Sequence, residues 1–367
     1  MSKLTEKLKT EIPGNTRSLV AIDHNLLERL ACPRHATRLC ETESGLSCDL
    51  GHSYPVVDDV PVLLEDGPQT LWVAHSSLMQ ARQLSSYSQT DPYHLGTLGI
   101  SEEQRAKLNW CLRNLNDGID PVVSFLVGAT NGIAYRHLIG KLQEYPIPRL
   151  RLPLGNGRVL LDVGCSWGRW CNAAAHLGYT AIGIDPSLGA ILAAKRVAAC
   201  LGSNVKFVVG DARYLPFPPG SVDIVFSYSV LQHFSSNDAV KAIKEIGRIL
   251  QFNGTSIIQM PTMFGLRCIY HQMRRGFREP KDFEVRYWSI PLLRRLFEEY
   301  VGPTTFSVDC FFGIGLQTAD LRFMPRRRRT IIWASELLRR TSMIFHLLRY
   351  LADSVFVEST KTTVELS

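Results

Sequence analysis

Three acidic residues in the middle of the chain each lie where an apolar run ends. Asp162 belongs to the stretch LDVGCSWGRW, Asp185 ends AIGID, and Asp211 follows VKFVVG. The separation of the first two suits a βαβ unit, in which the second carboxylate can accept both hydroxyls of a ribose. Gly164 and Gly168 belong to a turn that opens a helix, whose free N–H groups face a ligand. Together these residues predict a site for a nucleotide-like cofactor.

The composition of the turn separates the two cofactors that this arrangement suits. An NAD site uses three glycines, so that the pyrophosphate can approach the backbone. Here residues 164–168 read GCSWG, with Ser166 at the middle position. Asp162 would repel a pyrophosphate, whereas it suits a cationic sulfonium or amino group, and Asp211 can accept from an adenine amino group. Three acids and no basic residue in the turn therefore favour S-adenosylmethionine over NAD.

The elements that must position these residues alternate along residues 156–262. Apolar strands at RVLLDVG, TAIGID, VKFVVGD, VDIVFSYS and TSIIQMP are separated by helical stretches, which predicts a parallel, doubly wound sheet. A turn-rich segment at 1–66 ends in a hairpin at SYPVVDDVPVLL, and helices in LNWCLRNL and AYRHLIGKLQ are expected within 67–155. Residues 263–367 contain a helix at SIPLLRRLFEEY, strands at TTFSVDCFF and DSVFVES, and a basic helix between those strands. The sequence thus divides into four segments.

Four ordered segments carry a family resemblance, which extends from about Arg158 to Pro261. LDVGCSWGRW, AIGIDPS, VVGDARYLPFPPGSVDIVFSYSVLQHF and GRILQFNGTSIIQMP resemble the motifs of class I S-adenosylmethionine-dependent methyltransferases of the small-molecule, domain 11-like type. The resemblance implies a methyltransferase with a Rossmann-like α/β fold and a seven-stranded sheet. Cofactor contacts are expected from Asp162, Gly164, Cys165, Ser166, Gly168, Asp185, Pro186, Asp211, Ala212 and Ser227. Ser166 departs from the family's middle glycine, and its hydroxyl can bond the methionine carboxylate instead.

Tyr228, at the end of the fourth predicted strand, and His233, just after that strand, are candidates for catalysis. Methyl transfer from a sulfonium is an in-line displacement, in which proximity and orientation supply most of the rate. A base is needed only for a poor nucleophile such as a hydroxyl. His233 can serve as that base or as a packing residue. Tyr135 and His137 can belong to a helix that covers the cofactor, or to an ordinary helix face.

A second group of reactive residues lies near the N-terminus, where Cys32 and His35 are followed by Cys48 and His52. Paired soft and borderline ligands at this spacing can form a tetrahedral structural zinc site, and the metal would supply folding energy to so short a segment. Cys40 lies between the pairs as a spare. The segment resembles the zinc-ribbon domains of methyltransferase activator subunits, and those fused to some rRNA guanine methyltransferases. A metal-free mini-domain is the alternative.

The positive charge of the chain is concentrated in its C-terminal third. Between Gly265 and Tyr350, 16 Lys and Arg stand against 8 Asp and Glu, a local +8 that leaves −1 for the rest of a chain of net charge +7. Within 325–351, four consecutive arginines precede IIWASELLRRTSMIFHLLRYL. This basic amphipathic segment predicts a lid or interaction helix first, peripheral membrane contact second, and RNA binding third.

The predicted function is in-line methyl transfer to a small-molecule, lipid or saccharide acceptor. YSVLQHF follows the fourth strand in place of the Asn/Asp-Pro-Pro-aromatic tetrapeptide with which many methyltransferases hold a planar nitrogen. One alternative is an RNA base methyltransferase that binds RNA through the zinc ribbon and the arginine-rich segment, and another is a non-catalytic interaction module. The opening MSKLTEKLKTEIPG lacks a signal-peptide core and the nine cysteines are odd in number, which predicts a cytoplasmic protein, with membrane-peripheral contact as an option.

Overall fold

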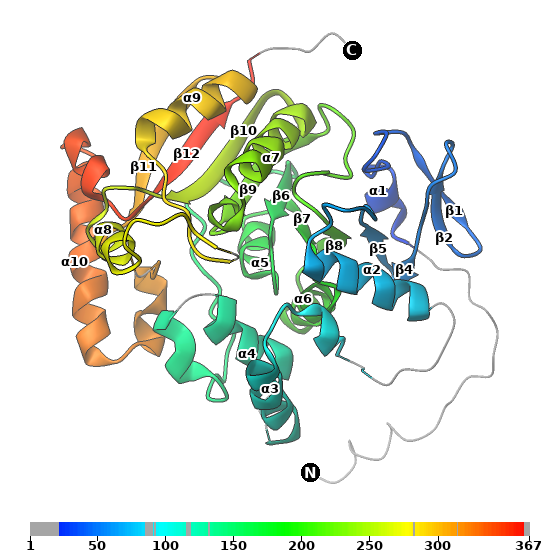
Figure 1. Cartoon of the computed structure of the whole chain (residues 1–367), viewed down its shortest axis with the longest axis horizontal. Coiled ribbons are helices and arrows are strands. Elements are labelled where there is room, and N and C mark those ends of the chain that lie inside the picture. The colour runs from blue at the N-terminus through cyan, green and yellow to red at the C-terminus, as the bar shows by residue number, and fades with distance from the viewer. Residues whose placement is uncertain are drawn as a thin grey trace.

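The computed structural model describes residues 22–84, 91, 93–114, 119–130, 133–281, 283–313 and 315–362. A nine-stranded sheet forms its centre, in the order β11-β12-β10-β9-β6-β7-β8-β5-β4 (Figure 1). The strands of the middle and of one end are β6 (Val159–Val163), β7 (Thr180–Asp185), β8 (Val205–Gly210), β9 (Val222–Tyr228), β10 (Leu250–Pro261), β11 (Thr304–Cys310) and β12 (Ser354–Thr360). β6 to β10 pair in parallel, and β12 is antiparallel to β10 and β11.

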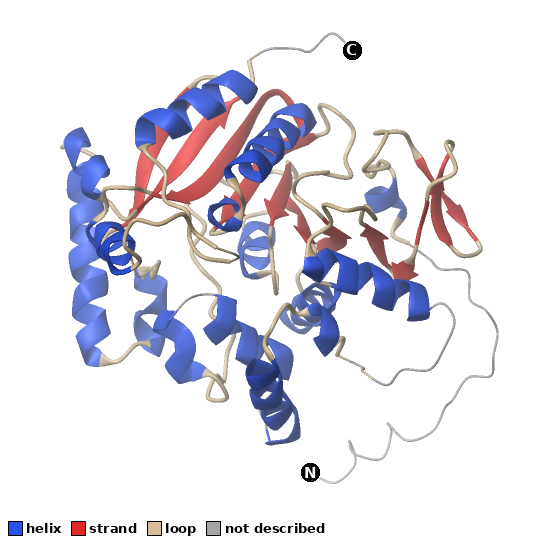
Figure 2. Cartoon of the chain, in the orientation of Figure 1, coloured by secondary structure: helices blue, strands red, loops and turns tan. Residues whose placement is uncertain are grey.

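The central strands are buried on both faces, as expected of a parallel sheet covered by helices on each side (Figure 2). In β6, Val159, Leu161 and Val163 belong to the apolar cluster that also contains residues of α7 (Ser236–Ile249) and α9 (Ile290–Tyr300). Leu160 belongs instead to the cluster on α5 (Arg169–His176). This alternation follows from the two-residue period of a strand. The helix α6 (Leu188–Leu201) begins where the Ser187 side chain accepts from the Ala190 N–H.

The N-terminal segment contributes two strands to the central sheet, which is why it holds nine strands rather than the predicted seven. β4 (Val56–Val57) and β5 (Val60–Leu63) form the hairpin, and β5 pairs in parallel with β8 through Val62 and Val209. The separate three-stranded sheet contains β1 (Leu39–Thr42), β2 (Gly45–Cys48) and β3 (Ser53–Tyr54), preceded by α1 (His24–Leu27). β5 thus covers an edge of β8 that would otherwise expose unpaired backbone groups.

The segment between β5 and β6 is mainly helical. It contains α2 (Trp72–Leu84), η1 (Leu95–Thr97), α3 (Glu102–Asn114), α4 (Pro121–Thr130) and η2 (Ile133–Leu138). α2 and η1 pack on α6, where the Ser77 hydroxyl accepts from the Leu188 N–H and the Thr97 hydroxyl from the Gly189 N–H. The helix expected in AYRHLIGKLQ is only the short 3-10 helix η2, because Gly140 takes a left-handed φ of 74°.

Beyond β10 the chain forms α8 (Leu266–Arg274), then α9, β11, η4 (Thr318–Phe323), α10 (Arg326–Ser342), η5 (His346–Leu351) and β12. The basic helix α10 therefore lies between β11 and β12 in the chain, and Figure 1 shows it beside that end of the sheet. The Ser335 hydroxyl accepts from the Phe311 N–H and fixes α10 to the end of β11. No helix among the described residues is both long enough and apolar enough to cross a membrane.

Candidate functional site

The turn between β6 and α5 takes the conformation that the glycines were expected to allow. Gly164 and Gly168 have φ values of 76° and 77°, in the left-handed region. A Cβ on Gly164 would lie 2.3 Å from Cγ2 of Val230, so only glycine fits there. Ser166 is also left-handed, at φ 47°, and its N–H donates to Oδ2 of Asp185 over 3.0 Å. The serine thus keeps a glycine-like backbone and ties the turn to the end of β7.

Two carboxylates flank this turn, the buried Asp162 and the half-buried Asp185. Burial raises the pKa of Asp162 to about 7; the Cys171 thiol, 3.2 Å from its Oδ2, opposes the rise and the nearby carboxylate of Asp185 adds to it. Burial also raises the pKa of Asp185 to about 6, although the N–H groups of Ser187 and Ser166 donate to it. A ligand that brings a positive charge and hydroxyl donors would stabilise both carboxylates.

Asp211 and Ala212 lie just past the end of β8, both buried. Both oxygens of Asp211 accept from Arg213, with the shortest N–O distance at 2.6 Å. Arg213 also donates to the carbonyl of Gln69 and pairs with Asp238, so the N-terminal part of the chain contacts this corner directly. Contact between Asp211 and an adenine stays a prediction, and it would use the lone pairs that Arg213 leaves free.

Two of the predicted cofactor residues turn their side chains into the sheet. The sulfurs of Cys165 and Cys171 would each lie 2.8 Å from a Cβ on Gly183, which places them against β7. The Ser227 hydroxyl donates to the carbonyl of Val163 over 2.8 Å, between β9 and β6. These two residues therefore present only main-chain atoms to the edge of the sheet. Pro186 is half-buried directly after Asp185.

The two candidate catalytic residues differ in what they can do. The Tyr228 hydroxyl donates to Oδ2 of Asp309 over 3.0 Å, and burial with the Asp309 charge raises the pKa of Tyr228 well above its usual range. Tyr228 is therefore a neutral phenol whose proton is already donated to Asp309. His233 Nδ1 lies 2.8 Å from the carbonyl of Phe283, so Nδ1 carries the proton and Nε2 keeps a lone pair, 3.1 Å from the Gln232 amide. Burial lowers the pKa of His233, which favours the neutral imidazole that a base requires.

The sequence reasoning missed a buried cation beside the turn. Arg169 is 8% exposed, and its guanidinium carbon lies 5.7 Å from the ring centre of Tyr135. Neither Arg169 Nε, the Tyr135 hydroxyl nor Oδ1 of Asp320 has a hydrogen-bond partner among the described residues. Such buried groups cost about 1–3 kcal/mol each when unpaired, so the cluster favours a polar ligand. Arg169 directly follows Gly168, just outside the turn in which no basic residue was counted.

The four predicted metal ligands come together in the N-terminal domain. One ligand atom from each of Cys32, His35, Cys48 and His52 lies within 4.8 Å of the other three. The Sγ–Nδ1 distance is 3.8 Å in both Cys–His pairs, close to the about 3.6 Å that tetrahedral zinc bond lengths give. The Tyr54 hydroxyl lies 3.2 Å from Sγ of Cys32 and supports it from outside the cluster. The donor set and its dimensions fit a four-coordinate zinc ion, and exposed Cys40 is not part of it.

Comparison with known proteins decides the class of the site, because residues 160–254 match the profile of a methyltransferase domain. The chain contains an S-adenosylmethionine-dependent methyltransferase domain. An uncharacterized methyltransferase of Geobacillus sp. is 28% identical over 158 residues, which cover 41% of this chain and 72% of that protein. The predicted enzyme class is therefore confirmed.

Other relatives of the methyltransferase domain differ in their acceptors. Ajmaline N-methyltransferase of Rauvolfia serpentina is 36% identical over 104 residues, or 28% of this chain and 35% of that enzyme. Probable tRNA methyltransferase 9B of Mus musculus is 30% identical over 164 residues, or 43% of this chain and 32% of that protein. This chain thus spans about a third of the length of these two relatives. Their names concern ajmaline and a tRNA, so the likeness leaves the acceptor open.

Proposed function

We propose that the protein transfers a methyl group from S-adenosylmethionine to a small-molecule, lipid or saccharide acceptor. The observation that carries the proposal is the pair of carboxylates, buried Asp162 and half-buried Asp185, whose pKa values are raised to about 7 and about 6 beside a left-handed glycine turn. An NAD pyrophosphate would add negative charge to this edge. A sulfonium cofactor that also carries an ammonium group would relieve it.

The residues present fit such a cofactor along the strand ends. Asp162 suits the ammonium group of its methionine part, and Asp185 suits the two ribose hydroxyls. Gly164 lets the turn pack against the Val230 side chain in its left-handed conformation, because no Cβ fits there. Asp211 with Ala212 suits the adenine. The bound cofactor would supply the electrophilic methyl group.

The protein's own contribution to the reaction is placement of the acceptor and removal of its proton. His233 follows β9 within the short helix η3 (Leu231–His233), and its Nε2 can accept a proton from a hydroxyl acceptor that takes the place of the Gln232 amide N–H. Its ring stacks on Phe283 with centroids 4.9 Å apart, and Phe283 is 75% exposed. An exposed aromatic ring next to the base supports an acceptor with an apolar part.

We also propose that the first segment, 1–66, is a structural zinc domain, followed by a helical cover at 67–155, the cofactor-binding core at 156–262 and the C-terminal part at 263–367. The cluster of Cys32, His35, Cys48 and His52 would hold the zinc, with all four positions filled by protein ligands. Such a site has no open position for catalysis. Its role would be to stabilise the hairpin that pairs with β8.

Calorimetric titration with S-adenosylhomocysteine tests the cofactor part of this proposal. Wild-type protein and an exposed control, Glu43→Gln, should bind in the micromolar range, whereas Asp185→Ala should lose binding. Absence of binding to folded wild-type protein would contradict the proposal and support a non-catalytic interaction module instead.

The acceptor is tested with radiolabelled S-adenosylmethionine and cell extract divided into organic-soluble, water-soluble small-molecule and RNA fractions. We expect label in one of the first two fractions, and His233→Gln to lower transfer about 10²–10⁴-fold for a hydroxyl acceptor with unchanged cofactor affinity. Label confined to RNA, with binding that weakens steeply as salt rises, would support the RNA base methyltransferase alternative.

A further inference from the structure

The helix α8 is amphipathic in the reverse sense, because its apolar side faces out. Leu266, Tyr270 and Met273 are 54%, 53% and 61% exposed, and their spacing of four and three residues places them in one stripe. Phe277, in a left-handed turn just beyond the end of the helix, is also exposed, at 68%. On the other side the helix buries only Cys268 and the polar Gln272. A helix of a soluble protein normally shows the opposite arrangement, which indicates that something covers this stripe.

A second exposed apolar group lies at the end of α10. Met343, Ile344, Phe345 and Leu347 are 67%, 75%, 62% and 80% exposed, within five consecutive positions. Four large apolar side chains in so short a turn form a projecting tip. We call these four residues with the α8 stripe the apolar face.

The two parts of the apolar face are joined through the chain around Asp353. Oδ1 of Asp353 accepts from the N–H groups of Arg267 and Cys268, and so fixes the start of α8. The Thr262 hydroxyl donates to the carbonyl of Ala352, directly after η5. The start of α8 therefore lies against the end of the segment that follows the tip, and Figure 1 shows α8 and α10 at the same end of the molecule.

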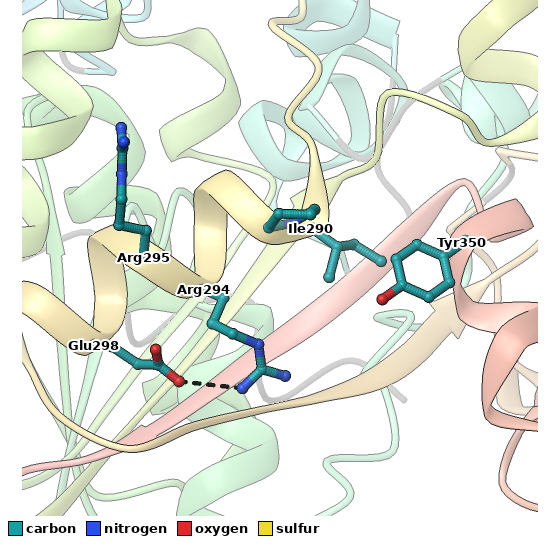
Figure 3. Close-up of a pocket in the computed structure, with 6 residues that line it drawn as sticks. Ile290, Arg294, Arg295, Glu298 and Tyr350 are labelled. Carbon is teal, nitrogen blue, oxygen red and sulfur yellow. Dashed lines mark hydrogen bonds and ion pairs between the residues drawn. The ribbon is translucent and has the colours of Figure 1, made fainter.

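Positive charge accompanies the apolar face. Arg267 and Arg274 on α8 are exposed, and α8 carries no acidic residue. A pocket beside η5 is lined by Ile290, Arg294 and Arg295 of α9 and by Tyr350 (Figure 3). There Arg294 bonds Glu298 over 3.1 Å, while the Arg295 side chain points away from that pair (Figure 3). The surface thus combines apolar side chains with cations.

The arginine run at the start of α10 adds less free positive charge to the surface than its sequence indicates. Arg328 donates to the carbonyl of Ala134 and to His137, and Arg329 donates to the carbonyl of Met324. Half of the run is therefore used to hold the helical cover and η4 in place. The other half, Arg326 and Arg327, is exposed, and further exposed cations lie on α8 and α9.

We propose that the apolar face binds the surface of an anionic lipid bilayer. Apolar side chains of the stripe and tip would enter the acyl region, while Arg267 and Arg274 would meet lipid phosphates. A second copy of the chain fits less well, since a two-fold interface would bring the same unpaired arginines toward each other. The proposal does not depend on the proposed function.

Vesicle flotation with the full chain tests this proposal. Wild-type protein should float with vesicles of phosphatidylcholine and phosphatidylglycerol, with weaker binding at high salt, and should not float with phosphatidylcholine alone. Met273→Asp with Ile344→Asp should weaken binding at least about 100-fold, because each buried apolar side chain accounts for about tenfold. The matched control is Leu154→Asp, which changes a 65% exposed leucine outside the apolar face and should float like wild type.

Light scattering without lipid tests whether a second copy of the chain, instead of a bilayer, covers the apolar face. We expect a monomer whose mass the double variant leaves unchanged, together with an unchanged melting temperature as a measure of folding. No flotation of wild type, equal flotation of the double variant, or a wild-type dimer that the double variant dissociates would each overturn the proposal. Arg267→Glu with Arg274→Glu should remove the preference for phosphatidylglycerol, and retention of that preference would overturn the role of the arginines.

Discussion

Cofactor affinity should depend strongly on pH, because the two carboxylates beside the turn must be ionised to accept from the ammonium group and the ribose hydroxyls that S-adenosylmethionine and S-adenosylhomocysteine share. Burial raises the pKa of Asp162 to about 7 and that of Asp185 to about 6. Below these values the free protein holds protons that ligand binding must displace. The affinity for S-adenosylhomocysteine should therefore be constant above pH about 7.5 and fall as the pH is lowered.

The size of the effect follows from the two pKa values. pH 5 lies about two units below the pKa of Asp162 and about one unit below that of Asp185. Each unit lowers the affinity by a factor of ten, or about 1.4 kcal/mol, because the carboxylate must lose its proton before it binds. Together they amount to about 1,000-fold in affinity, or about 4 kcal/mol. The charge of Arg169 near Asp162 opposes part of the rise, and its effect is already contained in the value of about 7.

Isothermal titration with S-adenosylhomocysteine between pH 5 and 8 measures this profile. Asp162→Asn cannot titrate, so it should keep only the smaller, lower step from Asp185, and Glu43→Gln should reproduce the wild-type profile. A wild-type affinity that is flat between pH 5 and 8 would refute the assignment of these carboxylates to the cofactor.

The stability of the free protein should change in the opposite sense. Because the folded pKa values of both acids lie above the usual 3.8, the folded state retains protons that the unfolded chain has released. Their contribution to stability is full below pH about 3.8 and is lost as the pH rises through about 6 and about 7. The melting temperature gained on adding S-adenosylhomocysteine should therefore be larger at pH 8 than at pH 5.

Three further substitutions probe the turn, the metal cluster and the buried cation. Gly164→Ala should abolish cofactor binding in calorimetry, and should cost about 1–2 kcal/mol of unfolding free energy in urea from the left-handed φ alone. Cys48→Ser should lose zinc by elemental analysis and lower the melting temperature, whereas Cys40→Ser should retain the metal; equal zinc in both would contradict the ligand assignment. Arg169→Met should weaken S-adenosylhomocysteine about 10–100-fold by removing a charged donor for its carboxylate, yet leave methylthioadenosine, which lacks that carboxylate, unaffected. Equal loss for both ligands would place Arg169 elsewhere.

The central strands and the turn that follows β6 could be predicted from the sequence, because the signal for each lies in neighbouring residues. VLLDV is apolar at every position but one, and it precedes a glycine turn, so strand, turn and helix follow from neighbouring residues. The four candidate metal ligands could also be predicted from the sequence, since two short Cys–His pairs bring four donors to two adjacent turns. Both predictions needed only residue type and spacing.

The remaining features depend on contacts that spacing does not reveal. Cys165 and Ser227 lie at the right positions of their motifs, but the alternation of side chains in the folded sheet turns both inward. The burial of Arg169 requires η2 and η4 to close over α5, and those elements are more than 30 residues before it and about 150 residues after it. Arg213 could have been noticed as a partner for Asp211, since the two lie two residues apart.

The placement of β5 changes how the N-terminal domain should be understood. A ribbon that served only as a docking module would leave its hairpin edge free for another protein. Here that edge is consumed by β8 of the same chain, through the pairs Val62–Val209 and Leu63–Gly210. The next residue, Asp211, is held by Arg213, which in turn bonds the carbonyl of Gln69. The N-terminal domain is therefore built into the strand that leads to the proposed adenine site, and this connection favours a part of the enzyme over a detachable interaction module.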